Sequence, residues 1–365
     1  MKSDWIPWAK PSYWGKESQY VSEALASSWI SGGPFVDQLE TEFKDRVRCG
    51  YAAAVSNGTT ALHASFLALG IAPRDEIVVP GFAFMAAANV ALHMGAIPVF
   101  AEVDSNTWCL DIQSVETCIT PKTRAIVAIH TYGNVCDLGP ILSLAHSRGV
   151  SVVEDAAEAL GSRYDGRYAG TMGRMGTFSF QATKSIATGE GGMVVTDDGD
   201  LHSRVCLYRS HGMSQRRYWH EVAGHNFRLT NLQAALGCAQ LEHTESIFSD
   251  RRRIHRSYRE LLSEIPGIIL QEFATSVDPV LWAMAVKLDG KAFPQGRDRV
   301  MEQLASQNIE TRPGFYAASQ MKLYNSPALP TCESISRQVI SLPTFPRISS
   351  EQISYVCQKL QSLRR

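Results

Sequence analysis

A lysine that directly follows a predicted buried strand is the residue in this sequence best suited to covalent chemistry. Lys184 comes after the predicted strand Thr177–Phe180 and before the glycine-rich turn 189–192. Burial and nearby positive charge lower the pKa of a lysine, and the neutral amine is a nucleophile towards aldehydes. The alternative is an ordinary surface lysine, which is the commonest setting for this residue type.

A carboxylate lies at the end of another apolar strand. Asp155 follows the predicted strand Ser151–Glu154, and ligands of open α/β sheets bind beyond the carboxyl ends of strands. There it could pair with a pyridinium nitrogen and keep it protonated, so that the ring acts as an electron sink. A metal-binding or structural aspartate fits this segment equally well.

The third segment, Ser56-Asn57-Gly58-Thr59-Thr60, lies where a strand ends and a helix begins. A helix start offers free N–H groups and a positive dipole end, which suit a phosphate. A simple N-cap in which a Ser or Thr side chain satisfies the helix start is an equal alternative. Taken together, a phosphate site, a pyridinium partner and an amine nucleophile are the parts of a pyridoxal-phosphate (PLP) enzyme.

The elements that must position these residues alternate between short apolar strands and helices. This alternation predicts an α/β fold with a mostly parallel sheet that is covered by helices on both faces. The predicted strands are 52–56, 76–79, 97–101, 125–129, 151–154, 177–180 and 193–196, and the predicted helices are 59–69, 85–94 and 141–147.

The last third of the chain has a different pattern. A long helical region is predicted from Leu232 towards Ser263, before the helix-breaking pair Pro266-Gly267. A strand near 282–288 and helices near 297–307 and 351–363 follow. We therefore expect a large cofactor-binding domain over residues 1–245 and a smaller α/β domain over residues 246–365.

Composition narrows the classes of function. The formal net charge of the 365 residues is −1, which argues against non-specific binding to nucleic acid or to an anionic membrane. The run Arg251-Arg252-Arg253 is interpreted as a solvated helix face. The eight cysteines contain no Cys-x-x-Cys pair, so we expect reduced thiols and no metal site.

The sequence also bears on the cellular location of the protein. Residues 1–4 carry no apolar signal segment, and the most apolar stretch, 77–100, is interrupted by two prolines, an asparagine and a histidine. We expect a soluble cytoplasmic protein.

At the level of motifs the chain resembles the DegT/DnrJ/StrS family of PLP-dependent aminotransferases, which have the type I fold and act on keto sugars. The resemblance runs from Ile6-Pro7 to Thr311-Arg312-Pro313. Its segments are the motifs beginning at Trp29, Ser56, Glu154, Thr188, Tyr218 and Asn226. Within the family, the chain is most similar to the perosamine-type subgroup, whose members aminate GDP-4-keto-6-deoxymannose.

The resemblance implies roles for particular residues. Lys184 would carry the cofactor as a Schiff base, and Asp155 would pair with the pyridine nitrogen. Phe84 would stack on the cofactor ring. The other implied cofactor contacts are the backbone at Thr59 and Thr60, the Ser179 hydroxyl, Glu158 (often Gln or His in the family), and Asn226 reaching the phosphate of the neighbouring subunit. A homodimer with shared active sites follows from that last role.

The implied reaction is transamination of a keto sugar with glutamate as the amino donor and 2-oxoglutarate as the product. The amino sugar would serve surface polysaccharides such as the O-antigen of lipopolysaccharide. Candidate substrate contacts are Trp14, Tyr218, Arg228 and Tyr316.

Three segments depart from the subgroup pattern: Gln181-Ala182-Thr183, the stretch 314–319, and Trp14. They leave open a UDP- or dTDP-linked sugar or a nucleotide-free keto sugar acid. A sugar dehydratase of the same fold typically has histidine in place of Lys184, and a non-catalytic binding protein would not need the intact set of residues.

Overall fold

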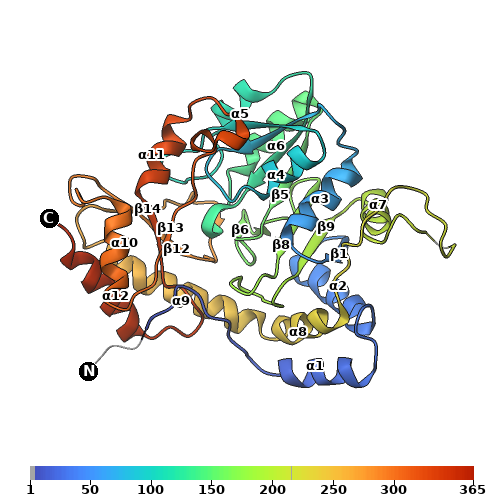
Figure 1. Ribbon diagram of the computed structural model, residues 1–365, viewed down its shortest axis with the longest axis horizontal. Coiled ribbons are helices and arrows are strands. Elements are labelled where there is room, and N and C mark those ends of the chain that lie inside the picture. Colours follow the sequence, from blue (N-terminus) through green and yellow to red (C-terminus); the bar gives the residue numbers. More distant parts are fainter. Residues whose placement is uncertain (1–4, 215) are drawn as a thin grey trace.

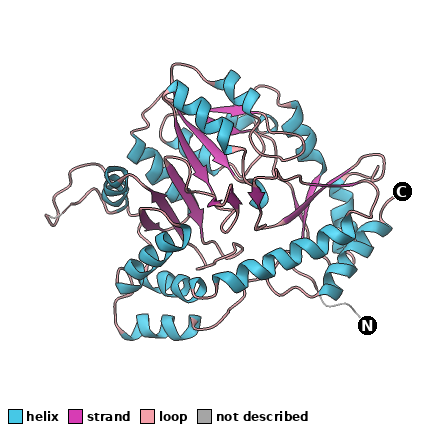
Figure 2. Cartoon of the chain, turned by 180° about the vertical axis from the view of Figure 1, so that it is seen from behind, coloured by secondary structure: helices cyan, strands magenta, loops and turns pink. Residues whose placement is uncertain are grey.

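A seven-stranded sheet forms the centre of the molecule (Figures 1 and 2). The computed structural model describes residues 5–214 and 216–365, so residues 1–4, for which the sequence predicts no signal segment, lie outside the described residues. The strand order is β1-β9-β8-β5-β4-β2-β3, and β9 runs antiparallel to both of its neighbours while the other strands are parallel to one another. The predicted α/β fold with a mostly parallel sheet is therefore confirmed. The strands of this sheet are β1 (Tyr51–Val55), β2 (Glu76–Pro80), β3 (Ile97–Ala101), β4 (Thr123–Ile129), β5 (Ser151–Asp155), β8 (Met175–Ser179) and β9 (Gly192–Thr196).

Helices cover both faces of this sheet because its strands bury side chains on both sides. In β4, Ile126 and Ala128 join one apolar cluster, while Ala125 and Val127 join another. Successive residues of a strand point to opposite faces. The first cluster includes residues of α2, α5, α6 and α8, and the second includes residues of α3 and α4. The helices up to this point of the chain are α1 (Glu17–Ala26), α2 (Pro34–Val47), α3 (Gly58–Leu69), α4 (Ala86–His93), α5 (Ile112–Cys118), α6 (Leu138–Arg148), α7 (Gly199–Arg209) and α8 (Asn231–Leu241).

The C-terminal part builds a separate four-stranded antiparallel sheet in the order β10-β12-β14-β13. Its core combines this sheet with α9, α10 and α12. The elements are α9 (Thr244–Leu262), β10 (Ile268–Leu270), β11 (Val277–Asp278), β12 (Met284–Leu288), α10 (Arg297–Ala305), β13 (Arg312–Pro313), α11 (Pro330–Gln338), β14 (Val339–Leu342) and α12 (Ser350–Ser362). A small third sheet joins β11 to β6 (Arg163–Tyr164) and β7 (Arg167–Tyr168).

The long helical region predicted towards Ser263 is two helices, α8 and α9, which are separated at Glu242 and His243. α8 contributes Ala234 and Cys238 to the core of the large sheet. α9 contributes Ile247 and Phe248 to that core and continues into the C-terminal core with Ile254.

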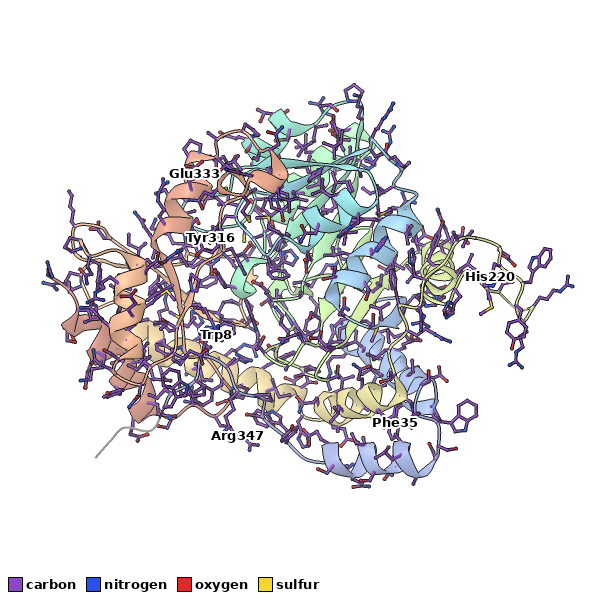
Figure 3. All side chains as sticks on the ribbon, viewed as in Figure 1. Trp8, Phe35, His220, Tyr316, Glu333 and Arg347 are labelled. Carbon is purple, nitrogen blue, oxygen red and sulfur yellow. The ribbon has the colours of Figure 1, made fainter. Side chains whose placement is uncertain are left out.

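The N-terminal segment crosses the molecule before α1 begins. Ile6 pairs with Ile309 next to the C-terminal sheet. Trp8 accepts a hydrogen bond from the Thr344 amide at its carbonyl (3.0 Å), and its own amide donates to Glu310 (3.0 Å). Further along, α1 packs against α8. Residues 6–26 thus contact residues beside the C-terminal sheet and also helix α8; Trp8 is labelled in Figure 3.

One segment projects from the body of the molecule next to α7, at the right of Figure 1. This projecting segment comprises residues 211–225, of which Gln215 is not described, and it contains His220, labelled in Figure 3. Tyr218 and Trp219 on it are 75 % and 56 % exposed. Among the described residues, no helix has the length and apolar character needed to cross a membrane.

Candidate active site

The carboxyl ends of three strands of the large sheet meet at one edge. Val55 is paired with Gly192, and Gly192 with Ser179, so the ends of β1 and β8 flank the start of β9. On the other side of β8, Asp155 is paired with Thr177. The loops that leave these strand ends carry the three segments singled out from the sequence, so the fold brings all three to the same edge.

Lys184 lies in the loop after β8. Its amide donates to the Gln181 carbonyl at 2.8 Å, and its side chain is 13 % exposed. Its Nζ is 3.8 Å from Glu158 Oε1 and 3.6 Å from the centroid of the Trp282 ring. Burial lowers the pKa of Lys184, Glu158 and Asp155 oppose this effect, and the charge of Arg251 adds to it. The surface-lysine alternative is therefore wrong, and the amine is one that releases its proton more readily than a solvated lysine.

Glu158 is the carboxylate nearest to that amine. It is 6 % exposed, and its Oε2 accepts a hydrogen bond from the Tyr132 amide at 2.8 Å. Burial raises the pKa of Glu158 to about 7, although Lys184 and the Tyr132 hydrogen bond act in the opposite direction. A group with such a pKa exchanges its proton near neutral pH.

Asp155 is the last residue of β5 and is 7 % exposed. Its neighbour Glu154 points to the other face of the sheet, where it pairs with His130 at 2.9 Å. Asp155 Oδ1 accepts from the Ala157 amide at 3.1 Å. Burial raises the pKa of Asp155, and the positive charge of Lys184 lowers it in part. A buried carboxylate in this setting would be stabilised by a cationic partner such as a protonated ring nitrogen.

The start of α3 is capped by Asn57. Asn57 Oδ1 accepts from the Thr60 amide at 2.8 Å, and Thr60 Oγ1 accepts from the Asn57 amide at 3.0 Å. The predicted Ser or Thr cap is therefore an asparagine cap, and the Thr60 amide already has a partner. The amides of Gly58 and Thr59 are at the first helical positions, where no intrahelical acceptor exists. These two N–H groups are the ones available to an anion.

Gly58 brings that helix start close to β8. A Cβ atom at Gly58 would come within 2.9 Å of Ser179 Cβ, and one at Gly192 would lie 2.5 Å from the Asn57 carbonyl oxygen. Ser179 accepts a long hydrogen bond from the Gln181 amide (3.4 Å), which leaves its hydroxyl proton available. The helix start and the Ser179 hydroxyl therefore form one cradle with the size and donors that a phosphate requires.

An exposed aromatic ring stands at the same edge. Phe84, in the loop after β2, is 62 % exposed, unusually high for a phenylalanine. Its ring is 6.3 Å from that of Phe315, which stacks on Tyr132 at 5.1 Å. A planar ligand ring would cover Phe84. Pyridoxal phosphate fits the residues present, because an amine, a buried carboxylate, a phosphate cradle and a free aromatic face meet here.

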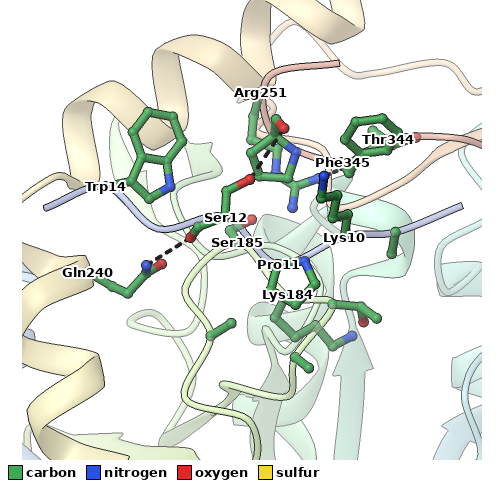
Figure 4. Close-up of a pocket in the computed structure, with 15 residues that line it drawn as sticks. Lys10, Pro11, Ser12, Trp14, Lys184, Ser185, Gln240, Arg251, Thr344 and Phe345 are labelled. Carbon is green, nitrogen blue, oxygen red and sulfur yellow. Dashed lines mark hydrogen bonds between the residues drawn. The ribbon is translucent and has the colours of Figure 1, made fainter. Parts of the chain in front are cut away.

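The predicted substrate residues are not all gathered at this edge. Trp14 and Lys184 line the same pocket, which Figure 4 shows, and Arg347 lies over the Trp14 ring at 4.3 Å. Tyr316 is 52 % exposed, with Arg297 over its ring. Tyr218 belongs to the projecting segment, where it is exposed and has Arg217 over its ring at 5.0 Å.

Arg228 and Asn226 lie at the base of the projecting segment. Arg228 Nε donates to Asn226 Oδ1 at 3.0 Å, and Arg228 is bridged to Val55 at the end of β1. Both side chains are exposed. No contact of either with Lys184 is found among the described residues.

Two residues at the site were missed by sequence reasoning. Trp282 comes from the segment before β12, and Arg251 comes from α9. The prediction that Arg251 belongs to a solvated helix face is wrong: Arg251 is 2 % exposed and donates to the carbonyls of Trp282 (2.8 Å) and Thr344 (2.7 Å). Arg252 and Arg253 are partly exposed. Figure 4 shows Arg251 facing the loop of Lys184.

Among the described residues no group of three His, Cys, Asp or Glu side chains has a geometry that could hold a metal ion.

Comparisons with known proteins agree with this geometry. The family model described as the DegT/DnrJ/EryC1/StrS aminotransferase family matches residues 12–361. GDP-perosamine synthase of Escherichia coli O157:H7 is 40 % identical over 360 residues, with 98 % of each chain covered, and GDP-perosamine synthase of Vibrio cholerae is 36 % identical with the same coverage. Among solved structures, S. venezuelae DesV superimposes with a TM-score of 0.91 at 31 % identity, covering 99 % of this chain and 98 % of the other. The chain therefore belongs to the DegT/DnrJ/EryC1/StrS family of PLP-dependent sugar aminotransferases.

Proposed function

We propose that the protein transfers an amino group from glutamate to C4 of GDP-4-keto-6-deoxymannose and releases 2-oxoglutarate. The observation that carries the aminotransferase chemistry is the convergence of Lys184, Asp155 and the cradle at the start of α3 on one edge of the sheet. The choice of sugar is supported by the full-length similarity to two proteins named GDP-perosamine synthase.

The chemistry of each residue follows from its surroundings. Bound pyridoxal phosphate supplies an electron sink for the negative charge that develops when a proton leaves the donor's α-carbon. Lys184 would anchor the cofactor covalently. When free, its amine would take that proton and return it to the carbon on the other side of the transferred nitrogen, a task suited to a lysine whose pKa is lowered by burial. Asp155 holds the proton on the ring nitrogen, and a charged partner there compensates for the burial of its carboxylate.

The remaining residues orient the reacting groups. The amides of Gly58 and Thr59 and the Ser179 hydroxyl hold the phosphate. Thr60 contributes by fixing the Asn57 cap. Phe84 covers one face of the ring. Glu158, 3.8 Å from the amine, exchanges a proton with Lys184 during the cycle. Trp14 and Tyr316 are proposed to contact the sugar nucleotide.

The active unit is proposed to be a homodimer with shared sites. In this arrangement the exposed Asn226 reaches the cofactor phosphate of the partner subunit, and Tyr218 and Arg228 contribute to the partner's substrate site. Two exposed aromatic side chains on the projecting segment, Tyr218 and Trp219, support this proposal, because exposed aromatic groups are typical of interfaces.

We also propose a cytoplasmic location, a role in surface-polysaccharide synthesis such as that of an O-antigen, and a domain division between residues 245 and 246. That division falls two residues into α9.

A second candidate function is the same transamination of a different keto sugar. The loop before Lys184 favours this candidate, because its sequence departs from the subgroup pattern. In this loop Gln181 Oε1 accepts hydrogen bonds from both the amide and the hydroxyl of Thr183 (2.8 and 2.6 Å). These two bonds within the loop lie next to the lysine amine. A UDP- or dTDP-linked sugar or a nucleotide-free keto sugar acid would be the substrate in that case.

The test is a comparison of kcat/KM for GDP-, UDP- and dTDP-linked 4-keto-6-deoxy sugars and a nucleotide-free keto sugar acid, each with glutamate, and with products identified by mass spectrometry. Buried polar groups left unpaired by a wrong substrate discriminate strongly, so we expect GDP-4-keto-6-deoxymannose to exceed the others by about 10²-fold or more. If another substrate has the highest value, the sugar assignment is wrong while the transamination stands. If no substrate yields an amino sugar, both fail.

A further inference from the structure

Trp282 contacts the Lys184 segment in two independent ways. The face of its indole ring lies under the lysine amine, with Nζ 3.6 Å from the ring centroid. Its indole N–H donates to the carbonyl of Thr183, the residue before the lysine, at 3.0 Å. One side chain therefore holds both the backbone beside Lys184 and the end of its side chain, although 99 residues separate Trp282 from Thr183.

The ring itself is held in place from several directions. The Trp282 amide donates to the Tyr132 carbonyl at 3.1 Å, and the Trp282 carbonyl accepts from Arg251 at 2.8 Å. Tyr132 stacks parallel to the indole at 6.3 Å, and Trp8 meets it edge-on at 5.5 Å. An indole fixed in this way presents a preformed surface, so the lysine does not have to order it.

We propose that Trp282 is a positioning residue for Lys184, and that its indole face is the resting place of the Lys184 amine whenever another amine occupies the cofactor. This inference rests on the function proposed above, in which Lys184 is released and recaptured in every cycle. It adds a specific place for the released amine and a residue that holds it there.

The physical basis is the attraction of a cation to the negative face of an aromatic ring. Tryptophan gives the strongest such interaction among the aromatic side chains, and the interaction grows when the cation has lost its water. The Lys184 side chain is 13 % exposed, and its nearest carboxylate oxygen, on Glu158, is 3.8 Å away, beyond hydrogen-bond distance. The indole face thus replaces part of the solvation that the ammonium group loses on burial.

A purely structural tryptophan is the competing explanation, because Trp282 also packs against Trp8 and Tyr132. The two explanations differ in what they predict for the lysine. A packing role predicts a loss of stability on substitution with no change in the acidity of Lys184. A resting place for the ammonium predicts that removal of the ring lowers the pKa of Lys184, since the protonated form loses a favourable contact.

The experiment uses the full-length chain freed of cofactor, with pyridoxal phosphate as the probe. The rate of its covalent uptake is followed by visible absorption as a function of pH, and borohydride reduction with peptide mass spectrometry identifies the lysine that is modified. The variants are Trp282→Leu, which removes the ring, and Trp282→Phe, which keeps an aromatic face but loses the N–H donor. Trp8→Leu is the matched control, because it removes packing against the Trp282 edge without touching Lys184.

We expect the pH midpoint for uptake to fall by about 0.5–1.5 pH units in Trp282→Leu, by less in Trp282→Phe, and to stay at the wild-type value in Trp8→Leu. If Trp282→Leu does not fold, as judged by circular dichroism, the shift between wild type and Trp282→Phe decides. Equal midpoints in wild type and the Trp282 variants, or an equal shift in Trp8→Leu, overturn the inference. Failure of the wild-type chain to bind pyridoxal phosphate at Lys184 would instead refute the proposed function.

Discussion

Replacing Glu158 by glutamine tests whether this carboxylate sets the protonation of Lys184. The amide oxygen of Glu158→Gln can still accept the hydrogen bond from Tyr132 that Glu158 accepts now, so the change removes charge and little else. Because the negative charge of Glu158 favours the ammonium form of Lys184, its loss should lower the pKa of the lysine.

The size of the effect follows from the geometry. Two unit charges 3.8 Å apart interact by about 4 kcal/mol at the effective dielectric constant of about 20 that suits such sites. The pKa of Glu158 is raised to about 7, so near neutral pH roughly half of the molecules carry the negative charge. Half of that interaction corresponds to a decrease of about 1.5 units in the pKa of Lys184.

The assay is the pH dependence of covalent pyridoxal-phosphate uptake by the cofactor-free chain, measured between about pH 6 and 10, the range that spans the two groups. The matched control is Glu190→Gln, an exposed carboxylate in the turn after Lys184. We expect the midpoint to move downward in Glu158→Gln and to stay in place in the control. An unchanged or higher midpoint in Glu158→Gln would refute the electrostatic reasoning.

Three further predictions concern the anchor, the ring partner and the shared site. Lys184→Ala should abolish turnover, and borohydride reduction of the wild type should fix the cofactor mass on the peptide that contains Lys184; recovery on another lysine contradicts the assignment. Asp155→Asn should keep the fold, as measured by circular dichroism, but lose about 10²-fold or more in kcat because an unpaired ring nitrogen is a poorer electron sink; near-wild-type turnover would argue against the role. Mixing inactive Lys184→Ala chains with impaired Asn226→Ala chains should restore activity, since a hybrid dimer contains one intact site; the absence of complementation would indicate a site built from one chain.

The sequence predicts the large sheet well because its strands depend on local patterns of apolar residues. Strand β3 has the bounds expected from its apolar run, and the other predicted strands of this sheet differ by one or two residues at their ends. Asp155 ends β5 and Lys184 lies in the loop after β8, so locating the strands also places these two residues of the candidate site. The resemblance to a known family added the roles of Phe84 and Glu158, which no local pattern indicates.

Contacts between distant parts of the chain could not be predicted in the same way. Trp282 meets Thr183 across 99 residues, and Arg251 meets Thr344 across 93. Arg251 is one of three adjacent arginines in the sequence. Which of the three is buried depends on which side of α9 faces the rest of the protein. The break between α8 and α9 was missed because the helical pattern of the sequence is continuous through Glu242 and His243.

The contacts of the N-terminal segment affect how the protein folds during its synthesis. Trp8 packs against Trp282 and makes a side-chain hydrogen bond to Ser341, a partner that lies 333 residues later in the chain. At ribosomal speeds of about 5–20 residues per second, roughly 17–67 s pass between the synthesis of Trp8 and that of Ser341. During that interval the Trp8 indole N–H lacks its native acceptor. The packing around Trp282, on whose ring face the Lys184 amine lies, is therefore complete only after β14 has been synthesised.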